Sequence, residues 1–323
     1  MSSRRCAFLD IGTNTILCLI VECDESGQFR VLDDLAEITR LGQGVDQTRV
    51  ISPAGEERNA AVLRSYLERC ARAGVEEITA VGTSALRDAT NSAEVLGRWR
   101  RQLGLQVRVI SGEEEAAYSF LAARQGLALA GEELLVIDIG GGSTEFIRGS
   151  AHGISDVVSV DLGSVRLTER FVHSDPASPE ECESMTQEID RALAPLVSRW
   201  LRDLPALTLV GIAATFTTLV AVEKKLTPYA GAEVHGSRVS DHEVRRQIEL
   251  YRSMNNAQRQ QIGGLHPQRA DVILAGALLV ERIMALFAVR HVIVSDQGVR
   301  YGLLHQRLDG GRVSRSGRGP KAR

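Results

Sequence analysis

The sequence predicts an α/β protein built from two related domains, and three observations support this. Short apolar runs that suit buried strands alternate with segments whose apolar residues recur at helical spacing. Two similar glycine-containing loops, at residues 10–15 and 138–144, each lie between two apolar runs. The chain has 323 residues, which is enough for two domains of ordinary size.

Local signals mark the elements of the first half of the chain. Ser52 followed by Pro53 is typical of a helix start, and Gly74 is typical of its end. Apolar runs on both sides of the loop at 10–15 predict a β-hairpin. The elements expected in order are strands at 6–9 and 16–21, a helix from 53, a strand at 77–81, a helix ending at Gly104, a strand at 106–110 and a helix from Gly112.

The second half repeats this pattern less regularly. A second hairpin is expected around the loop at 138–144, and Ser178-Pro179 opens a long helix with a kink at Pro195. Ser240 and Glu243 cap a further helix. The elements expected after the hairpin are the helix from 179, a strand at 207–211, the helix capped by Ser240, an apolar helix over 270–288, a strand at 291–295 and a turn at 296–298.

The two glycine-containing loops suit phosphate binding. Glycine lets the backbone come close to a ligand, and the N–H groups of such a turn, with Ser and Thr hydroxyls, suit phosphate oxygens. Asp10 and Asp138 stand at strand ends, where a carboxylate can hold Mg²⁺ directly or through water. Glycine turns after strands are common, so the first loop alone is weak evidence. Together the loops favour two related domains that face a shared phosphoryl group.

Two common nucleotide-binding motifs do not match the second loop. A dinucleotide fingerprint, G-x-G-x-x-G, opens a helix. Here Glu145 occupies the third glycine position, and Phe146-Ile147 continues as a strand. A Walker loop needs Gly-Lys-Ser or Gly-Lys-Thr, which the sequence lacks. Both interpretations are therefore set aside.

Three adjacent glutamates stand at the predicted start of the helix at 112. Ser111 and Glu114 have the S-x-x-E spacing of a capping box. Acidic residues are favourable at a helix N-terminus, which is by itself a sufficient structural reason for all three. Glu115, however, projects about 100° around the helix from Glu114, so it points away from the box. Glu115 is therefore also a candidate catalytic residue.

Composition narrows the class of protein. Hydrophobic residues make up 44% and charged residues 24%, and the net charge of −3 gives no general attraction to nucleic acid or anionic membranes. The most apolar stretches, 207–222 and 272–280, are too short or too rich in Thr to span a bilayer. Five cysteines form no C-x-x-C pair, which favours a reduced cytoplasmic protein without a cysteine metal site. The basic residues of 311–323 predict a disordered tail, for which steering of polyanions remains an alternative.

At this point the sequence resembles the exopolyphosphatase / guanosine pentaphosphate phosphohydrolase family, which belongs to the superfold of actin, sugar kinases and heat-shock chaperone ATPases. The resemblance rests on motifs in family order over roughly the first 305 residues. They are Phe8-Leu9-Asp10-Ile11-Gly12-Thr13-Asn14, Gly82-Thr83-Ser84-Ala85-Leu86-Arg87, Ile110-Ser111-Gly112-Glu113-Glu114-Glu115-Ala116, Val136-Ile137-Asp138-Ile139-Gly140-Gly141-Gly142-Ser143-Thr144-Glu145, Leu162-Gly163-Ser164-Val165-Arg166-Leu167-Thr168-Glu169, Arg269-Ala270-Asp271-Val272-Ile273-Leu274-Ala275-Gly276 and Gly298-Val299-Arg300-Tyr301-Gly302-Leu303-Leu304.

The resemblance implies two actin-like (ribonuclease H-like) domains with an active-site cleft between them. It places the first domain at 1–125 with a returning segment at about 300–310, and the second at 126–299. It implies a Mg²⁺-dependent hydrolase that acts on inorganic polyphosphate or guanosine pentaphosphate, and a homodimer. The residues implied are catalytic Glu115, Glu145 and Arg87; phosphate-binding Gly12, Thr13, Asn14, Gly140, Gly141, Gly142 and Ser143; and metal-binding Asp138, Asp10 and Glu145.

Two departures from the family pattern stand out. Family members usually carry Gly-Gly-Thr where this chain has Ala213-Ala214-Thr215, and alanine is unfavourable if those positions need φ > 0. A nucleotide or phosphate contact from this loop is therefore in doubt. The sequence also stops soon after Leu304, without the C-terminal helical domains that longer members use for dimerisation and for holding long polyphosphate.

We expect a Mg²⁺-dependent exopolyphosphatase in which Glu115 activates the attacking water. Guanosine pentaphosphate 5′-phosphohydrolase is the nearest alternative, because the motifs address only terminal phosphates. An aromatic content of 4% weakly favours polyphosphate, since a base pocket needs aromatic or apolar groups. A sugar or acetate kinase of the same superfold is less favoured by the Ser-Gly-x-Glu-Glu-Ala segment. A non-catalytic sensor of polyphosphate or alarmone is favoured only by Ala213-Ala214.

Overall fold

The chain forms two compact units, seen here in a computed structural model that describes residues 3–24, 26–129, 133–200 and 207–316. Unit 1 comprises 1–122 and 299–323, and unit 2 comprises 123–298. The sequence predicts domain boundaries at 125/126 and at about 300. The expected cleft between the domains stays a prediction.

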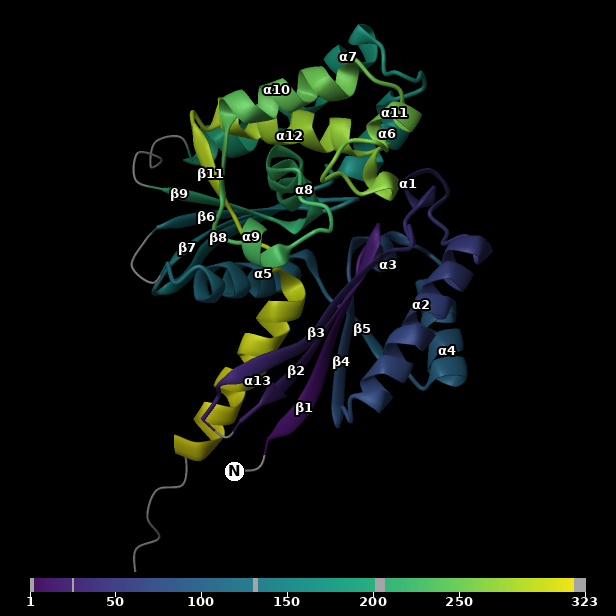
Figure 1. Cartoon of the computed structure of the whole chain (residues 1–323), viewed down its shortest axis with the longest axis vertical. Helices are drawn as coiled ribbons and strands as arrows, with labels where there is room; N and C mark the ends of the chain where they lie inside the picture. The colour runs from purple at the N-terminus through teal and green to yellow at the C-terminus, as the bar shows by residue number, and fades with distance from the viewer. Residues whose placement is uncertain (1–2, 25, 130–132, 201–206, 317–323) are drawn as a thin grey trace, which may run out of the picture. The chain divides into compact units, whose positions relative to one another are not determined.

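Unit 1 contains a five-stranded sheet in the order β3-β2-β1-β4-β5 (Figure 1). β1 pairs antiparallel with β2 and parallel with β4, which in turn pairs parallel with β5. Its elements are β1 (Arg4–Ile11), β2 (Thr15–Cys23), β3 (Phe29–Ile38), α1 (Val45–Thr48), α2 (Pro53–Arg72), β4 (Glu77–Gly82), α3 (Ser84–Asp88), α4 (Ser92–Leu103), β5 (Val107–Val109), α5 (Gly112–Gly126), which runs across the boundary, and α13 (Val299–Ser316).

The buried side chains of β1 alternate between the two faces of the sheet, which explains why helices cover both faces. Ala7, Leu9 and Ile11 pack with residues of α2 and α4, whereas Cys6 and Phe8 pack with residues of α5 and α13. Successive strand residues point to opposite faces, so a strand that is apolar at both sets of positions needs helices on both sides. Figure 1 shows α2 and α4 together on one side of this sheet and α13 on the other. Each fully buried Leu, Ile or Phe side chain contributes about 1.5–3 kcal/mol.

Helix α13 returns the chain to unit 1 and is fixed there by close packing and an ion pair. A Cβ at Gly302 would lie 2.1 Å from the Tyr118 carbonyl oxygen, so only glycine allows α13 to approach α5 this closely. Arg300 donates to both carboxylate oxygens of Asp34 on β3, at 2.7 and 3.0 Å. The Tyr301 hydroxyl also donates to Asp34, at 3.0 Å.

The predicted start of the disordered tail, at 311, lies inside helix α13. Helix α13 continues to Ser316, so residues 311–316 are helical, whereas the prediction placed them in a disordered tail. Adding a residue to an existing helix gains a backbone hydrogen bond, which offsets the weak helix propensity of Gly310 and Gly311. The rest of the predicted tail, 317–323, lies outside the described residues.

Unit 2 contains a six-stranded sheet in the order β10-β11-β9-β6-β7-β8. β6 pairs antiparallel with β7 and parallel with β9, as β1 pairs with β2 and β4 in unit 1. Its elements are β6 (Leu134–Ile139), β7 (Thr144–Ser150), β8 (Gly153–Val160), α6 (Ser164–Phe171), α7 (Pro179–Trp200), β9 (Thr208–Ile212), α8 (Ala213–Lys224), α9 (Gly231–Val234), β10 (Arg238–Ser240), α10 (Asp241–Arg252), α11 (Asn256–Arg259), the 3-10 turn η2 (Pro267–Arg269), α12 (Ile273–Leu286) and β11 (His291–Val294).

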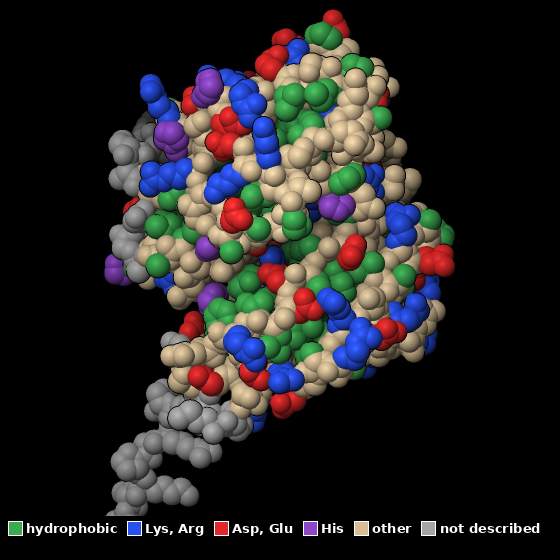
Figure 2. Space-filling view, viewed as in Figure 1, with side chains coloured by type: hydrophobic (Ala, Val, Ile, Leu, Met, Phe, Trp, Pro, Cys, Tyr) green, Lys and Arg blue, Asp and Glu red, His purple; other side chains and the backbone are tan. Residues whose placement is uncertain are grey.

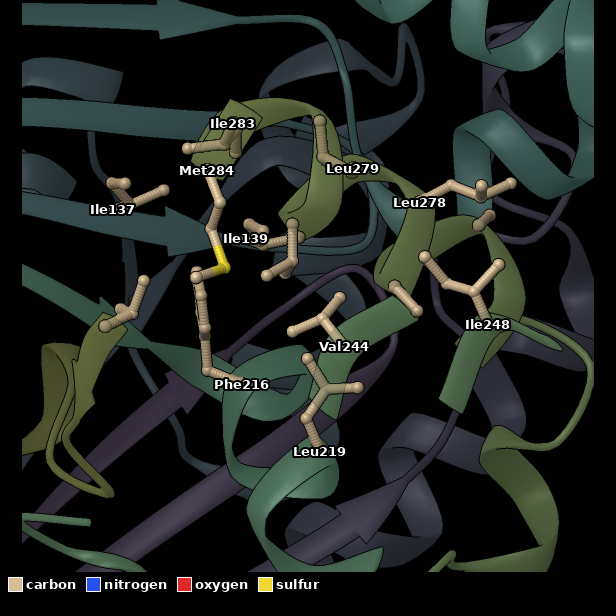
Figure 3. Packing of buried hydrophobic residues seen from close by; sticks show 14 of the residues in the cluster. Ile137, Ile139, Phe216, Leu219, Val244, Ile248, Leu278, Leu279, Ile283 and Met284 are labelled. Carbon is tan, nitrogen blue, oxygen red and sulfur yellow. The ribbon is translucent and has the colours of Figure 1, made fainter. Parts of the chain in front are cut away.

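One large hydrophobic core holds unit 2 together. Figure 3 shows Phe216 and Leu219 of α8 and Met284 of α12 packed beside Ile137 and Ile139 of β6. Helix α12 is buried over most of its length, which explains its nearly continuous apolar sequence. This core supports β6 and the loop that follows it, where the second set of candidate residues lies.

The molecular surface carries charges of both signs. On the face drawn in Figure 2, Lys and Arg side chains are interspersed with Asp and Glu. Among the described residues, no helix is both long enough and apolar enough to cross a membrane. All five cysteines are free thiols.

Candidate active site

The first glycine-containing loop is the tip of the β1–β2 hairpin, as predicted. The turn closes through a hydrogen bond from the Gly12 N–H to the Thr15 carbonyl, at 3.0 Å. Backbone N–H groups of the segment 39–42 donate three hydrogen bonds to the carbonyls of Thr13 and Asn14, at 2.9 to 3.0 Å. These carbonyls are therefore fixed toward the segment, and the peptide N–H groups that follow them point the other way.

A close approach explains one residue of the supporting segment. A Cβ at Gly42 would lie 2.3 Å from the methyl carbon of Thr13 and 3.2 Å from the Cβ of Ala85. Glycine at this position lets the segment lie directly against the loop. Arg40 has a left-handed backbone with φ of 52°, which is uncommon for a residue with a side chain.

Parallel pairing brings the first set of candidate residues to one edge of the sheet. Ile11 of β1 pairs with Gly82 of β4, which pairs with Val109 of β5. The carboxyl ends of these three strands therefore lie together. They are followed by the first loop, by α3 and by the start of α5, so this edge carries Asp10, Gly12, Thr13, Asn14, Arg87 and Glu115.

Arg87 and Glu115 form an ion pair at this edge. The Arg87 Nη1 donates to Glu115 Oε2 at 2.6 Å and to the Ile110 carbonyl at 3.0 Å. The Arg87 side chain is 22% exposed and that of Glu115 is 12% exposed, so the pair is largely, but not fully, removed from solvent. A cation suited to phosphate thus lies directly beside a carboxylate suited to act as a base.

The capping box at the start of α5 is confirmed. The Glu114 N–H donates to Ser111 Oγ at 3.1 Å, and the Ser111 N–H donates to Glu114 Oε2 at 3.0 Å. The hydrogen bond from Ser111, with a second from Arg108, lowers the pKa of Glu114. Glu114 serves the helix end, whereas Glu115 turns away from it to Arg87.

The second glycine-containing loop is the tip of the β6–β7 hairpin, also as predicted. The Gly140 N–H donates to the Ser143 carbonyl at 3.0 Å. Asp138 and Glu145 lie directly opposite each other across the two strands, so their side chains share one face of the sheet. Both are nearly buried, at 7% and 1% exposure, and Glu145 Oε1 accepts a hydrogen bond from Ser159 Oγ at 2.8 Å.

The carboxylates of unit 2 are suited to a magnesium ion. Mg²⁺ prefers oxygen ligands and is often held by one or two carboxylates together with substrate phosphates. Asp138 and Glu145 supply two such groups side by side. Among the described residues, no cluster of three or more His, Cys, Asp or Glu side chains is arranged to hold a metal ion. Asp138 and Glu145 match the oxygen donors that Mg²⁺ prefers.

The loop after β9 needs the backbone conformation that alanine disfavours. Ala213, the first residue of α8, has a φ of 65°, whereas Ala214 is not among the residues with positive φ. A Cβ at Gly211 would lie 2.4 Å from the ring of Phe216. Of the two alanines that stand where the family usually has glycine, one is thus strained.

The candidate residues form two groups, one in each unit. Asp10, the residues of the first loop, Arg87 and Glu115 lie in unit 1. Asp138, the residues of the second loop and Glu145 lie in unit 2. Sequence reasoning assigned no role to two features that support the loops, the segment 39–42 and Arg166. Two sequence signals mark these features. The segment 39–42 ends at the first glycine of Gly42-Gln43-Gly44, and Arg166 lies in one of the family motifs, but neither signal identifies the residues that they contact.

Comparison with known proteins finds related sequences and related structures. The model of the Ppx/GppA phosphatase family matches residues 19–310. The protein named exopolyphosphatase 2 of Mycobacterium tuberculosis is 37% identical over 296 residues, covering 88% of this chain and 91% of that protein. The crystal structure of the Aquifex aeolicus member of the Ppx/GppA family has a TM-score of 0.79 and 32% identity, covering 96% of this chain and 99% of that one. A structure described as an exopolyphosphatase from Cytophaga hutchinsonii has a TM-score of 0.88 and 26% identity, covering 95% and 98%.

Proposed function

Because the chain belongs to the Ppx/GppA phosphatase family, an enzyme family of actin-like two-domain fold, we propose that it is an exopolyphosphatase. It would release orthophosphate from the end of inorganic polyphosphate by attack of water. The relatives named exopolyphosphatase support this activity. The observation that carries the mechanism is the ion pair between Arg87 and Glu115, with 2.6 Å between Nη1 and Oε2.

Glu115 is the proposed general base. A carboxylate within hydrogen-bond reach of the attacking water takes its proton as the new P–O bond forms. Arg87 donates one N–H to Glu115 and one to the Ile110 carbonyl, and a guanidinium carries five such donors in a planar fork. A phosphoryl oxygen bound by its other donors therefore lies within reach of the carboxylate. This arrangement explains why the arginine and the glutamate occur together.

The second loop is the proposed site for the terminal phosphoryl oxygens. The carbonyls of Gly140, Gly141 and Gly142 accept hydrogen bonds from residues of α6, so the amide N–H groups of residues 141–143 point away from α6, toward an anion on the other side. Fixed donors of this kind stabilise the charge of the transferring phosphoryl group without having to reorganise. We assign Gly12, Thr13 and Asn14 of the first loop to the same task.

Mg²⁺ is part of the proposal. Asp138, Glu145 and Asp10 are the residues that would hold it. When bound, the ion neutralises part of the charge on the phosphate oxygens. The proposal predicts that a chelator abolishes phosphate release and that added Mg²⁺ restores it.

The decisive experiment compares Glu115→Gln with its neighbour Glu114→Gln. Phosphate release from long-chain polyphosphate and from guanosine pentaphosphate is measured at matched terminal-phosphate concentrations. Loss of a general base costs 10²–10⁴-fold in rate, so we expect Glu115→Gln to lose activity by about that factor while still binding polyphosphate. Glu114→Gln should stay close to the parent rate, because glutamine also serves a capping box.

Three outcomes would change the assignment. Faster release from guanosine pentaphosphate would make the protein an alarmone hydrolase with the same machinery. Equal loss in both glutamine variants would mean that Glu115 acts on the helix rather than on the water. Binding of polyphosphate without release from either substrate would favour a sensor. We also propose that the protein is a cytoplasmic homodimer. The mass of the purified protein in solution tests whether it is a dimer.

A further inference from the structure

The second loop turns three consecutive carbonyls toward helix α6. The Gly140 carbonyl accepts a hydrogen bond from the Ser164 N–H at 3.1 Å. The Gly141 carbonyl accepts from the N–H groups of Val165 and Arg166, at 2.9 and 3.0 Å. The Gly142 carbonyl accepts from the Arg166 side chain, with 2.7 Å between Nε and the oxygen.

This pattern fixes where the amide protons of the loop point. In a trans peptide the C=O and the following N–H lie on opposite sides. Because the carbonyls of 140–142 face α6, the N–H groups of 141–143 face away from it. Successive N–H groups on one side of a turn form a concave site for an anion. The hydrogen bonds to α6 thus build the phosphate-binding face of the loop.

Arg166 differs from the other donors because it acts through its side chain. The peptides after Gly140 and Gly141 are held by backbone groups, which a substitution does not remove. The peptide between Gly142 and Ser143 is held by the Arg166 guanidinium. The residue is 7% exposed, and a guanidinium is rarely buried this far unless its N–H groups are bonded.

The Arg166 Nη2 is also 3.9 Å from Asp161, whose side chain is 82% exposed, so water screens that ion pair. The contact through which Arg166 acts on the loop is the hydrogen bond to the Gly142 carbonyl.

We propose that Arg166 is a positioning residue of the phosphate site. It holds the Gly142–Ser143 peptide so that the Ser143 N–H faces the terminal phosphoryl group. This inference rests on the proposed function for the identity of the substrate. It does not require Arg166 to touch the substrate, which distinguishes it from Arg87.

The test compares three variants of Arg166 with a structural control in the full-length protein. Arg166→Met removes both donor and charge, Arg166→Gln removes the charge but keeps an N–H donor, and Arg166→Lys keeps the charge. The control is Arg282→Met, because Arg282 of α12 makes a two-point contact with Asp190 of α7, at 2.7 and 3.0 Å, in the same unit. KM and kcat for polyphosphate, calorimetric binding of inorganic phosphate, and the unfolding midpoint are measured for each.

We expect Arg166→Met to weaken phosphate binding and raise KM by about ten-fold or more, with Arg166→Gln and Arg166→Lys between it and the parent. Arg282→Met should lower the unfolding midpoint while KM and phosphate binding stay within two-fold of the parent. If Arg166→Met lowers the midpoint but leaves both phosphate binding and KM unchanged, the inference is wrong. If Arg166→Met does not fold, the glutamine and lysine variants decide by the same criterion.

Phosphate binding separates this inference from the proposed function. A parent protein that binds phosphate but hydrolyses neither polyphosphate nor guanosine pentaphosphate would contradict the proposed enzyme, while the Arg166 variants would still test the loop. A parent that hydrolyses polyphosphate, with Arg166 variants unchanged in KM and phosphate binding, would contradict the inference and leave the function standing.

Discussion

Ala213→Gly should stabilise the protein, although glycine normally weakens a helix. Ala213 has a φ of 65°, in the left-handed region. For an L-residue with a Cβ this region costs roughly 1–2 kcal/mol. Glycine removes that cost but loses about 0.4–1 kcal/mol, because its unfolded chain is more flexible. The net gain is therefore about 0.5–1 kcal/mol, which corresponds to an increase of roughly 1–2 °C in Tm for a chain of this size.

The neighbouring alanine supplies the control. Ala214 lies in the same helix and is not among the residues with positive φ. Ala214→Gly should therefore lose about 1 kcal/mol, the usual difference in helix propensity. Urea unfolding of the parent and the two variants measures both changes under one set of conditions. If Ala213→Gly destabilises the protein as much as Ala214→Gly, the strain assigned to Ala213 is not present.

Two further predictions concern pH and the second loop. Burial lowers the pKa of His305 below its ordinary value of 6.5, and among described side chains its Nε2 is one of the buried atoms with no hydrogen-bond partner. Because the unfolded chain binds the proton at a higher pH than the folded protein does, the free energy of unfolding should fall as the pH drops below about 6.5. Denaturation at pH 5 and pH 7 measures this loss of stability, which should be smaller in His305→Leu than in the parent. An equal loss in both proteins would exclude this histidine as the cause. Gly163→Ala places a Cβ 2.3 Å from the Gly141 carbonyl oxygen, so the loop has to shift, at a cost of about 1–3 kcal/mol and with a higher KM. Gly97→Ala is the control, because a Cβ at Gly97 would lie 3.4 Å from the flexible end of the Arg101 side chain. This variant should stabilise α4 by about 0.5–1 kcal/mol. If both variants behave alike in unfolding and kinetic assays, the close contact at Gly163 is contradicted.

Sequence reasoning succeeded where the cause of a structure is local. The Ser52-Pro53 pattern predicts a helix start, and the structure confirms it, since the Ser52 hydroxyl accepts a hydrogen bond from the backbone N–H of Gly55. The same holds for the capping box of α5, and with it for the inference that Glu115 points away from Glu114. Both hairpins followed from glycine turns between apolar runs. In each case the partners lie within a few residues of one another, so spacing alone identifies them.

The contacts that complete the candidate site are not local. Arg87 and Glu115 are 28 positions apart, and Arg166 lies 24 positions after the carbonyl that it holds. No periodicity or turn signal relates such residues, because the pairing of strands decides which chain ends become neighbours. The exact boundary between the units also cannot be predicted from the spacing of residues in the sequence. Helix α5 runs across it, and one continuous helix carries no local signal where its packing partner changes.

The two loops share a local sequence pattern but are held by different means, and this difference predicts where substitutions matter. In unit 1 the carbonyls of Thr13 and Asn14 accept from backbone N–H groups of the segment 39–42. Most side chains of that segment can change without removing these bonds, apart from Gly42, whose lack of a Cβ permits the contact. In unit 2 the third carbonyl is held by a side chain, so the Arg166 position should be as sensitive to substitution as the glycines of the loop itself. A repeated hairpin therefore does not imply repeated support, and each loop has to be tested through the residues that hold it.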